Sequence, residues 1–214
     1  MIAGASAVGK TVIASRLIEL NSSFRLIRSA TTRQPRKDGH DSEYLYCSRE
    51  EFLSAVEKGE MLEYMEYAGE FYGTPRTEIL RVSGEGYTPL FILDLNGVES
   101  LDKAEGISPM SVYIYGDINT IEQRLYDRYL NPPSPKGFSS FVSRKEKNIE
   151  DYLSIEKYAD SFYAFVKNEG TVSECAETIL SLYFAFLNGE KRNEEQCRTT
   201  AALLCQSAMA KIGN

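Results

Sequence analysis

The residues with the clearest chemistry stand at the start of the chain. The run GASAVGKT fits the spacing G-x-x-x-x-G-K-T and lies between an apolar segment and a segment of helical pattern. In that setting, backbone N–H groups of a tight loop converge on a phosphate, and the N-terminus of the next helix adds positive potential. The pattern therefore predicts a nucleoside triphosphate site formed by Gly4, Ala5, Ser6, Ala7, Val8, Gly9, Lys10 and Thr11.

A carboxylate further along the chain can share a metal ion with this loop. In such loops the lysine, here Lys10, reaches the terminal phosphates, and the hydroxyl that follows it, here Thr11, binds Mg²⁺. The run FILDL places Asp94 at the end of an apolar strand, where it can hold Mg²⁺ through a water. Strand ends often carry polar residues, so Asp94 alone is weaker evidence than the loop.

A second group of basic and hydroxyl side chains lies in the run SATTRQPR, residues 29–36. Arg33 and Arg36 can each bind a phosphate through two hydrogen bonds, and Ser29 adds a hydroxyl. The whole chain has a net charge of −7, so a basic segment favours a local anion site over general nucleic-acid binding. One triphosphate site and one monophosphate site together predict phosphoryl transfer between two nucleotides. A solvated basic loop is the alternative.

Apolar and helical segments alternate along the chain, which has 214 residues and 43% hydrophobic content. That length supports one filled core, and the alternation predicts a parallel sheet with helices on both faces. Strands are expected at 1–4, 24–30, 89–95, 110–116 and 162–168. Helices are expected at 10–20, 48–59, 117–130, 141–157 and 171–189.

Three segments depart from this alternation. Residues 61–75 are rich in tyrosine and predict two short strands around a turn, within an inserted subdomain. Residues 131–140, NPPSPKGFSS, contain three prolines and a glycine and predict irregular structure. A final helix has one apolar face, which packs either on its own domain or on a second copy. That face consists of Cys197, Ala201, Leu204, Cys205, Ala208 and Ile212.

The composition excludes several classes of protein. There is no run of 18 apolar residues, and the N-terminus lacks a secretory pattern, so no membrane association is expected. The four cysteines show no C-x-x-C spacing, which favours reduced thiols, a cytoplasmic location and no zinc site. His40 is the only histidine, so catalysis that needs several histidines is excluded.

These motifs occur in the order and spacing found in guanylate kinases, which this chain resembles from residue 1 to about 188. The motifs are GASAVGKT, SATTRQPR, EYLY, LEYMEYAGEFYGTP, ILDL, RLYDR and VKNEG. The resemblance implies an α/β fold of the P-loop NTPase type, with a three-layer α/β/α core, a parallel sheet, a small inserted GMP-binding subdomain and a helical lid. It also implies the conversion of ATP and GMP to ADP and GDP, with Mg²⁺ as cofactor and ATP as co-substrate.

The resemblance also implies a division of the chain. The core would comprise residues 1–32, 76–125 and 158–188, the GMP-binding subdomain about 33–75, and the lid about 126–157. Residues 189–214 would form a C-terminal extension with an amphipathic helix. The partners would be ATP and GMP, with no nucleic acid, and the protein would be a monomer or a homodimer.

On the acceptor side, the resemblance implies a phosphate clamp and a base reader. Glu63 would accept hydrogen bonds from N1–H and the exocyclic amine of guanine, and Thr74 would complete the base site. Glu66, on the same expected strand, competes for the role of Glu63, and Asp94 is also placed near GMP. The clamp would consist of Ser29, Arg33, Arg36, Tyr44 and Tyr72, although the two tyrosines could instead be ordinary strand aromatics.

On the donor side, the resemblance implies arginines that neutralise charge during transfer. Alternatively, Arg124 and Arg128, which lie one helical turn apart, could be surface charges paired with Glu122 or Asp127. Asn168 would form part of the ATP base pocket. The implied catalytic groups are Lys10, Arg124, Arg128 and Arg144.

The sequence departs from the family pattern at several positions. Ala7 stands where the family usually has glycine, so a left-handed backbone there would be strained. Asp38 is a doubtful match for an acid that contacts GMP. The segment after Asp94 is short and lacks a second aspartate, whose place Asn96 would take without the charge.

Two other functions therefore stay open. One is a catalytically weak module that binds phosphorylated ligands, and the other is a small kinase with a different phosphorylated acceptor. Lys10 and Thr11 favour an enzyme over a binding module, and Glu63 favours GMP over other acceptors.

Overall fold

The central sheet is built from short strands that are mostly buried. β1 (Ile2–Gly4) lies between β8 (Ile92–Leu93) and β9 (Val112–Tyr115), and β10 (Ala164–Lys167) pairs with β9; all three pairs are parallel. β2 (Phe24–Leu26) pairs in parallel with β7 (Thr88–Leu90), which only Phe91 separates from β8.

The structure is a computed structural model that describes residues 1–35, 44–67, 69–104, 106, 108–133 and 135–213.

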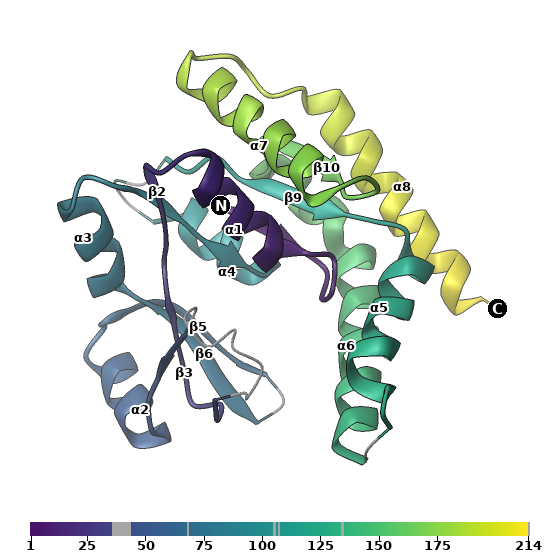
Figure 1. Ribbon diagram of the computed structural model, residues 1–214, viewed down its shortest axis with the longest axis horizontal. Coiled ribbons are helices and arrows are strands. Elements are labelled where there is room, and N and C mark those ends of the chain that lie inside the picture. The colour runs from purple at the N-terminus through teal and green to yellow at the C-terminus, as the bar shows by residue number, and fades with distance from the viewer. Residues whose placement is uncertain (36–43, 68, 105, 107, 134, 214) are drawn as a thin grey trace.

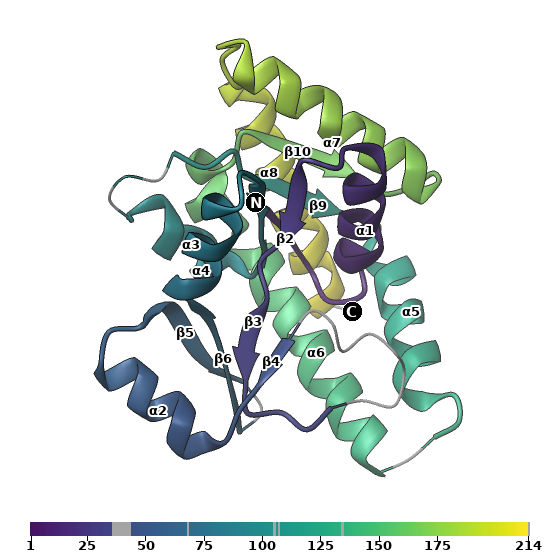
Figure 2. The same cartoon turned by 60° about the vertical axis from the view of Figure 1, so that its left-hand side comes forward.

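Helices cover both faces of this sheet, as the alternation predicts (Figures 1 and 2). α1 (Lys10–Leu20) and α7 (Val172–Leu187) pack together on one face. α4 (Leu95–Asp102), the 3₁₀ helix η2 (Ile155–Ser161) and α8 (Glu194–Ile212) pack on the other. The core is therefore the expected three-layer α/β/α arrangement with a parallel sheet.

A smaller sheet forms a second unit beside the core, at the lower left of Figure 1. Its strand order is β4 (Tyr44–Tyr46), β3 (Ser29–Thr31), β6 (Glu70–Pro75), β5 (Met61–Tyr67). α2 (Arg49–Glu57) covers this sheet and begins with a capping box between Ser48 and Glu51. Phe52 on α2 stacks on Phe71, with ring centres 5.3 Å apart, and so forms a small separate core. The expected two-stranded hairpin at 61–75 is confirmed.

The chain crosses between the two units at a break that periodicity did not predict. Residues 24–30 were expected to form one strand, but β2 ends at Leu26 in its pair with β7 beside the core sheet, and β3 begins at Ser29 in the smaller sheet. Arg28, at the break, donates to Glu78 on α3 (Arg76–Gly84) at 2.7 Å. Burial alone would raise the pKa of Glu78, but hydrogen bonds from Arg28 and Arg81 outweigh it and lower that pKa to about 2. This buried carboxylate ties the crossing to α3.

Two further helices, α5 (Ile118–Leu130) and α6 (Pro135–Ser154), form a pair on the opposite side from the smaller sheet (Figure 1). The expectation that residues 131–140 are irregular is confirmed for 131–133 and wrong from Pro135 onward, where α6 begins. Proline suits the first turn of a helix, where its missing N–H would have no partner in any case.

The C-terminal helix α8 packs on its own chain, against α6 and η2. Five of the six expected residues are buried there: Cys197, Ala201, Leu204, Cys205 and Ala208. Ile212 does not belong to this face, because it is 60% exposed near the chain end. Among the described residues, no helix has the length and apolar character needed to cross a membrane.

Candidate active site

The loop from Gly4 to Lys10 joins β1 to α1, and its shape depends on small residues. A Cβ at Gly4 would lie 2.2 Å from the Ile114 carbonyl oxygen, so no larger residue fits against β9. Gly9 has a φ of 106° and caps the N-terminus of α1. The backbone of the loop therefore follows a path that ordinary side chains disfavour.

Ala7 in this loop has a φ of 65°, in the left-handed region, so the expected strain is present. We expect Ala7→Gly to raise the free energy of unfolding by about 0.5–1 kcal/mol, because glycine adopts this conformation without the clash. The matched control is Ala185→Gly in α7, which should lower the free energy of unfolding by about 1 kcal/mol. Urea denaturation measures both changes, and a loss of stability in both variants would contradict the strain.

Lys10 is folded back beneath the loop. Its Nζ donates to the carbonyl oxygens of Gly4 at 2.6 Å and Ala5 at 2.9 Å. Burial lowers the pKa of Lys10 to about 8, although the carboxylates of Asp151 and Asp94 act in the opposite direction. Both bonded acceptors are neutral, so a phosphate oxygen would be a stronger partner for this ammonium.

A cavity of about 510 Å³ runs along the loop. Its walls come from three regions that are far apart in the sequence: the phosphate loop, the strands of the smaller sheet, and the helix pair α5 and α6. The expected site residues that line it are Ser6, Ala7, Gly9, Lys10, Thr11, Ser29, Arg33, Tyr44, Arg124, Arg128 and Arg144. The fold thus brings the phosphate loop, the residues expected to clamp the acceptor and the three expected catalytic arginines into one space.

Three arginines of α5 and α6 line this cavity: Arg124, Arg128 and Arg144. The alternative, that Arg124 or Arg128 pairs with Glu122 or Asp127, is not what the described part of the structure shows. Among the described residues, Glu122 is bonded by Lys145 and Lys211, and Asp127 accepts from Gln123. The guanidinium groups of Arg128 and Arg144 each lie 5.5 Å from the ring centre of Tyr129. Both cations are therefore within the range of a cation–π interaction with the same ring.

A smaller cavity of about 220 Å³ joins this space on the acceptor side, and Glu63, Tyr72 and Asp94 line it. Glu63 Oε1 accepts from the Thr74 hydroxyl at 2.6 Å. Burial raises the pKa of Glu63, and the Thr74 hydrogen bond opposes that shift. Glu66 instead forms an ion pair with Arg49 at 3.6 Å, and half of its side chain is exposed. Of these two glutamates, only Glu63 lines the smaller cavity.

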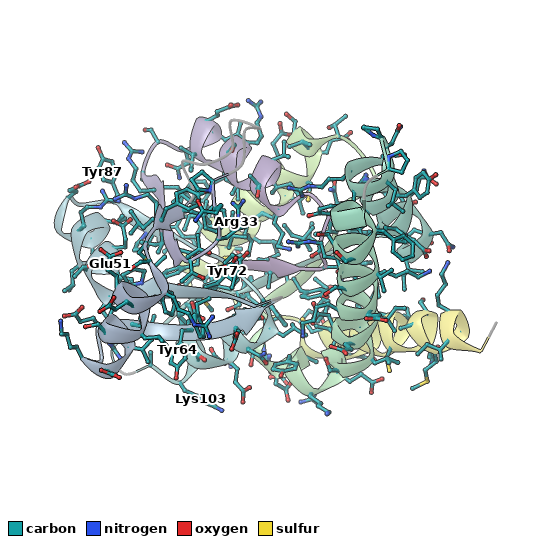
Figure 3. The ribbon with its side chains drawn as sticks, turned by 90° about the horizontal axis from the view of Figure 1, so that it is seen from below. Arg33, Glu51, Tyr64, Tyr72, Tyr87 and Lys103 are labelled. Atoms are coloured by element: carbon teal, nitrogen blue, oxygen red, sulfur yellow. The ribbon has the colours of Figure 1, made fainter. Side chains whose placement is uncertain are left out.

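Arg33 is held by aromatic side chains of β4. Its guanidinium lies 5.1 Å from the ring centre of Tyr44 and 5.7 Å from that of Tyr46, and it donates to the Tyr46 hydroxyl at 3.1 Å. Figure 3 shows Arg33 and Tyr72 toward the middle of the molecule. Sequence reasoning missed Tyr46, although the two-residue period of EYLY places it on the same strand face as Tyr44. Arg36 and Asp38 lie outside the described residues.

Asp94 and Thr11 could bind a magnesium ion that enters the site together with a nucleotide. Asp94 caps α4 through Oδ1, which accepts from the Gly97 N–H at 2.8 Å. Its Oδ2 is shielded from solvent and has no hydrogen-bond partner among the described residues. Within that same part of the chain, no three His, Cys, Asp or Glu side chains form a metal cluster. Mg²⁺ usually takes one or two protein oxygens and completes its shell with phosphates and waters, so Asp94 and Thr11 suffice.

The comparisons with known proteins agree with this geometry. The family model described as guanylate kinase matches residues 1–131, which is more than half of the chain. The chain belongs to the guanylate kinase family. A guanylate kinase of Cereibacter sphaeroides is 35% identical over 75% of this chain and 79% of its own length. Another, of Lactobacillus johnsonii, is 30% identical over 85% of each chain.

Solved structures show the same fold. The crystal structure of guanylate kinase from Anaplasma phagocytophilum superposes with a TM-score of 0.59. That alignment covers 92% of this chain and 88% of the other, at 22% identity. The P-loop NTPase fold implied by the sequence motifs is therefore confirmed for this family member.

Asn168, expected in the ATP base pocket, contacts the phosphate loop from behind. Asn168 Nδ2 donates to the Val8 carbonyl oxygen at 2.7 Å, and the residue is buried behind the phosphate loop. A Cβ at Gly9 would come within 2.9 Å of that nitrogen, so Gly9 permits the close approach. This position supports a role in holding the loop, and contact with the ATP base stays a prediction.

Asn96 does not take the place of the missing second aspartate. It is exposed, and its Oδ1 accepts from Tyr158 at 3.3 Å. An acid from α6, Asp151, lines the smaller cavity together with Asp94 and pairs with Lys147 at 3.1 Å. In the sequence, the charged run RKEKNIED around these residues is typical of a solvated helix face, so nothing there identified Asp151.

Proposed function

We propose that this member of the guanylate kinase family transfers the γ-phosphoryl group of ATP to the phosphate of GMP, giving ADP and GDP. The observation that carries the proposal is the single cavity lined by the phosphate loop, by Ser29 and Arg33, and by three arginines of α5 and α6. The names of the relatives support the same reaction. Donor and acceptor can meet there without a covalent intermediate, as direct in-line phosphoryl transfer requires.

On the donor side, the loop amides and Lys10 would hold the phosphates of ATP. Mg²⁺, when bound with the nucleotide beside Thr11 and Asp94, would neutralise charge on the terminal phosphates. Arg124, Arg128 and Arg144 line the same cavity and can stabilise charge on the transferring group. No general base is needed, because a nucleotide phosphate is already ionised at neutral pH.

On the acceptor side, Ser29, Arg33, Tyr44 and Tyr72 surround the space where the GMP phosphate would bind. The Thr74 hydroxyl donates to Oε1 of Glu63, which orients the carboxylate toward the smaller cavity. That carboxylate can accept from N1–H and the exocyclic amine of guanine together. Adenine does not present this pair of donors, so selectivity for guanine would follow.

The division into core, subdomain and lid is also proposed, with one boundary moved. β3 belongs to the smaller sheet, so the subdomain would begin near Arg28 rather than at residue 33. Closure of the helix pair over the cavity would exclude water and limit wasteful hydrolysis of ATP. All four cysteines are free thiols, which fits a reducing cytoplasm, where we propose that the enzyme works.

A wild-type assay with four acceptors tests this function. ADP release with Mg-ATP should be fast with GMP and at least about a hundredfold slower with AMP, CMP and UMP. Equal rates with another monophosphate would favour the small-kinase alternative, and no turnover with any of the four would favour the binding module.

The same assay tests the base reader. Glu63→Gln should lower kcat/KM for GMP about tenfold to a hundredfold, because the amide replaces a charged acceptor and places N–H groups against guanine donors. The matched control is Glu66→Gln on the same strand, which should leave the acceptor profile unchanged. If Glu63→Gln keeps the wild-type profile across the four bases, Glu63 is not the reader.

A further inference from the structure

We propose that Asn148 on α6 is a positioning residue that holds the phosphate loop in its nucleotide-binding shape. Its Oδ1 accepts from the Ser6 N–H at 2.6 Å, and its Nδ2 donates to the Ser6 carbonyl oxygen at 3.1 Å. One side-chain amide thus binds both backbone groups of one loop residue. The proposal rests on the proposed function, because it concerns the loop that would hold ATP.

The contact suits asparagine in particular. An amide offers one acceptor and two donors on neighbouring atoms, which match the N–H and C=O of a single residue. Asn148 is only 5% exposed, so water competes weakly for these two hydrogen bonds. A buried pair of this kind fixes the backbone of the residue that precedes the strained Ala7.

The same face of α6 carries further groups of the site. Arg144 donates to the Ser6 hydroxyl at 3.2 Å and lines the larger cavity. Lys147 and Asp151 line the smaller one. The spacing of these three residues and Asn148 places them on adjacent turns of one helix face. Asn148 therefore fixes the distance between the loop that holds the donor phosphates and the arginine that would stabilise the transferring group.

A second contact anchors this half of α6 to the core. The Tyr152 hydroxyl accepts from the Gly116 N–H at 3.3 Å and donates to the Gly116 carbonyl oxygen at 3.1 Å. Tyr152 is buried, and Gly116 directly follows β9. With both contacts made, α6 is joined to the core at two points one turn apart, Asn148 and Tyr152.

These two contacts provide a matched pair of variants. Asn148→Ala and Tyr152→Phe each remove two hydrogen bonds between α6 and one backbone residue, but only the first touches the phosphate loop. Urea denaturation, the dissociation constant of Mg-ADP by calorimetry, and kcat and KM for ATP are measured for both. The wild type is assayed in parallel. If it fails to phosphorylate GMP, the proposed function is refuted. The affinity of Asn148→Ala for Mg-ADP still tests the role of Asn148 in that case.

Both variants should unfold at lower urea concentration than the wild type. Only Asn148→Ala should weaken Mg-ADP binding, by about tenfold, and lower kcat/KM for ATP by about tenfold to a hundredfold. Should Asn148→Ala fail to fold, Asn148→Ser is judged by the same criterion, with a smaller expected loss. Wild-type Mg-ADP affinity in the Asn148 variant, or an equal loss in Tyr152→Phe, would overturn the proposal.

Discussion

Replacing Lys10 with alanine should lower kcat at least about a thousandfold and leave the protein folded. The Lys10 side chain lines the larger cavity beside the phosphate loop, and no other lysine lines that cavity within the described part of the chain. Stability should not fall, because burial already disfavours the charge and lowers the pKa of Lys10 to about 8. ADP release measures the rate, and circular dichroism with urea denaturation measures the fold.

The control for this variant is Lys103→Ala. Lys103 is exposed, pairs with Glu99 on the same helix and lies at the edge of the molecule (Figure 3), so wild-type kinetics are expected. Near-normal turnover in a folded Lys10→Ala protein would contradict the donor site. An unfolded Lys10→Ala protein would contradict the expectation that this buried charge does not stabilise the fold.

Replacing Arg33 with alanine should raise KM for GMP about a hundredfold while KM for ATP changes little. The guanidinium lies 5.1 Å from the Tyr44 ring centre and donates to the Tyr46 hydroxyl, so it is already oriented at the shared cavity before a ligand binds. Two charge-assisted hydrogen bonds to a phosphate contribute about 3 kcal/mol, which corresponds to about a hundredfold in affinity. Initial rates at varied GMP and saturating ATP measure the effect.

The matched control for Arg33 is Arg49→Ala in the same subdomain. Arg49 lies over the Phe71 ring at 4.4 Å and pairs with Glu66, and it lines neither nucleotide cavity. Its removal should leave KM for both nucleotides unchanged. The acceptor clamp would be refuted by an Arg33→Ala enzyme with normal GMP kinetics, or by one that loses ATP and GMP affinity in equal measure.

Local features of the fold could be predicted from the sequence because their causes are local. The loop from Gly4 to Thr11 and the hairpin at 61–75 follow from short-range patterns, and the structure contains both. The left-handed strain at Ala7 was also predictable, since one side chain stands where a glycine is expected. In each case, neighbouring residues decide the backbone.

Features that depend on distant contacts could not be predicted. Asn148 and Ser6 are 142 positions apart, and nothing near either residue indicates their pairing. The break between β2 and β3 has the same cause, because the segment from Phe24 to Ala30 does not reveal which sheet each half joins. Pro135 was read as a helix breaker because its tolerance at a helix start depends on where the helix begins.

The central claim is that one cavity holds both nucleotides in register for direct transfer. A crystal structure of the protein with Mg²⁺, a non-hydrolysable ATP analogue and GMP measures this directly. We predict the analogue phosphates on the loop beside Lys10 and the GMP phosphate on Arg33, with an acceptor oxygen about 3–3.5 Å from the γ-phosphorus. A GMP bound outside the cavity, or a closed complex with the two phosphates too far apart to react, would contradict it.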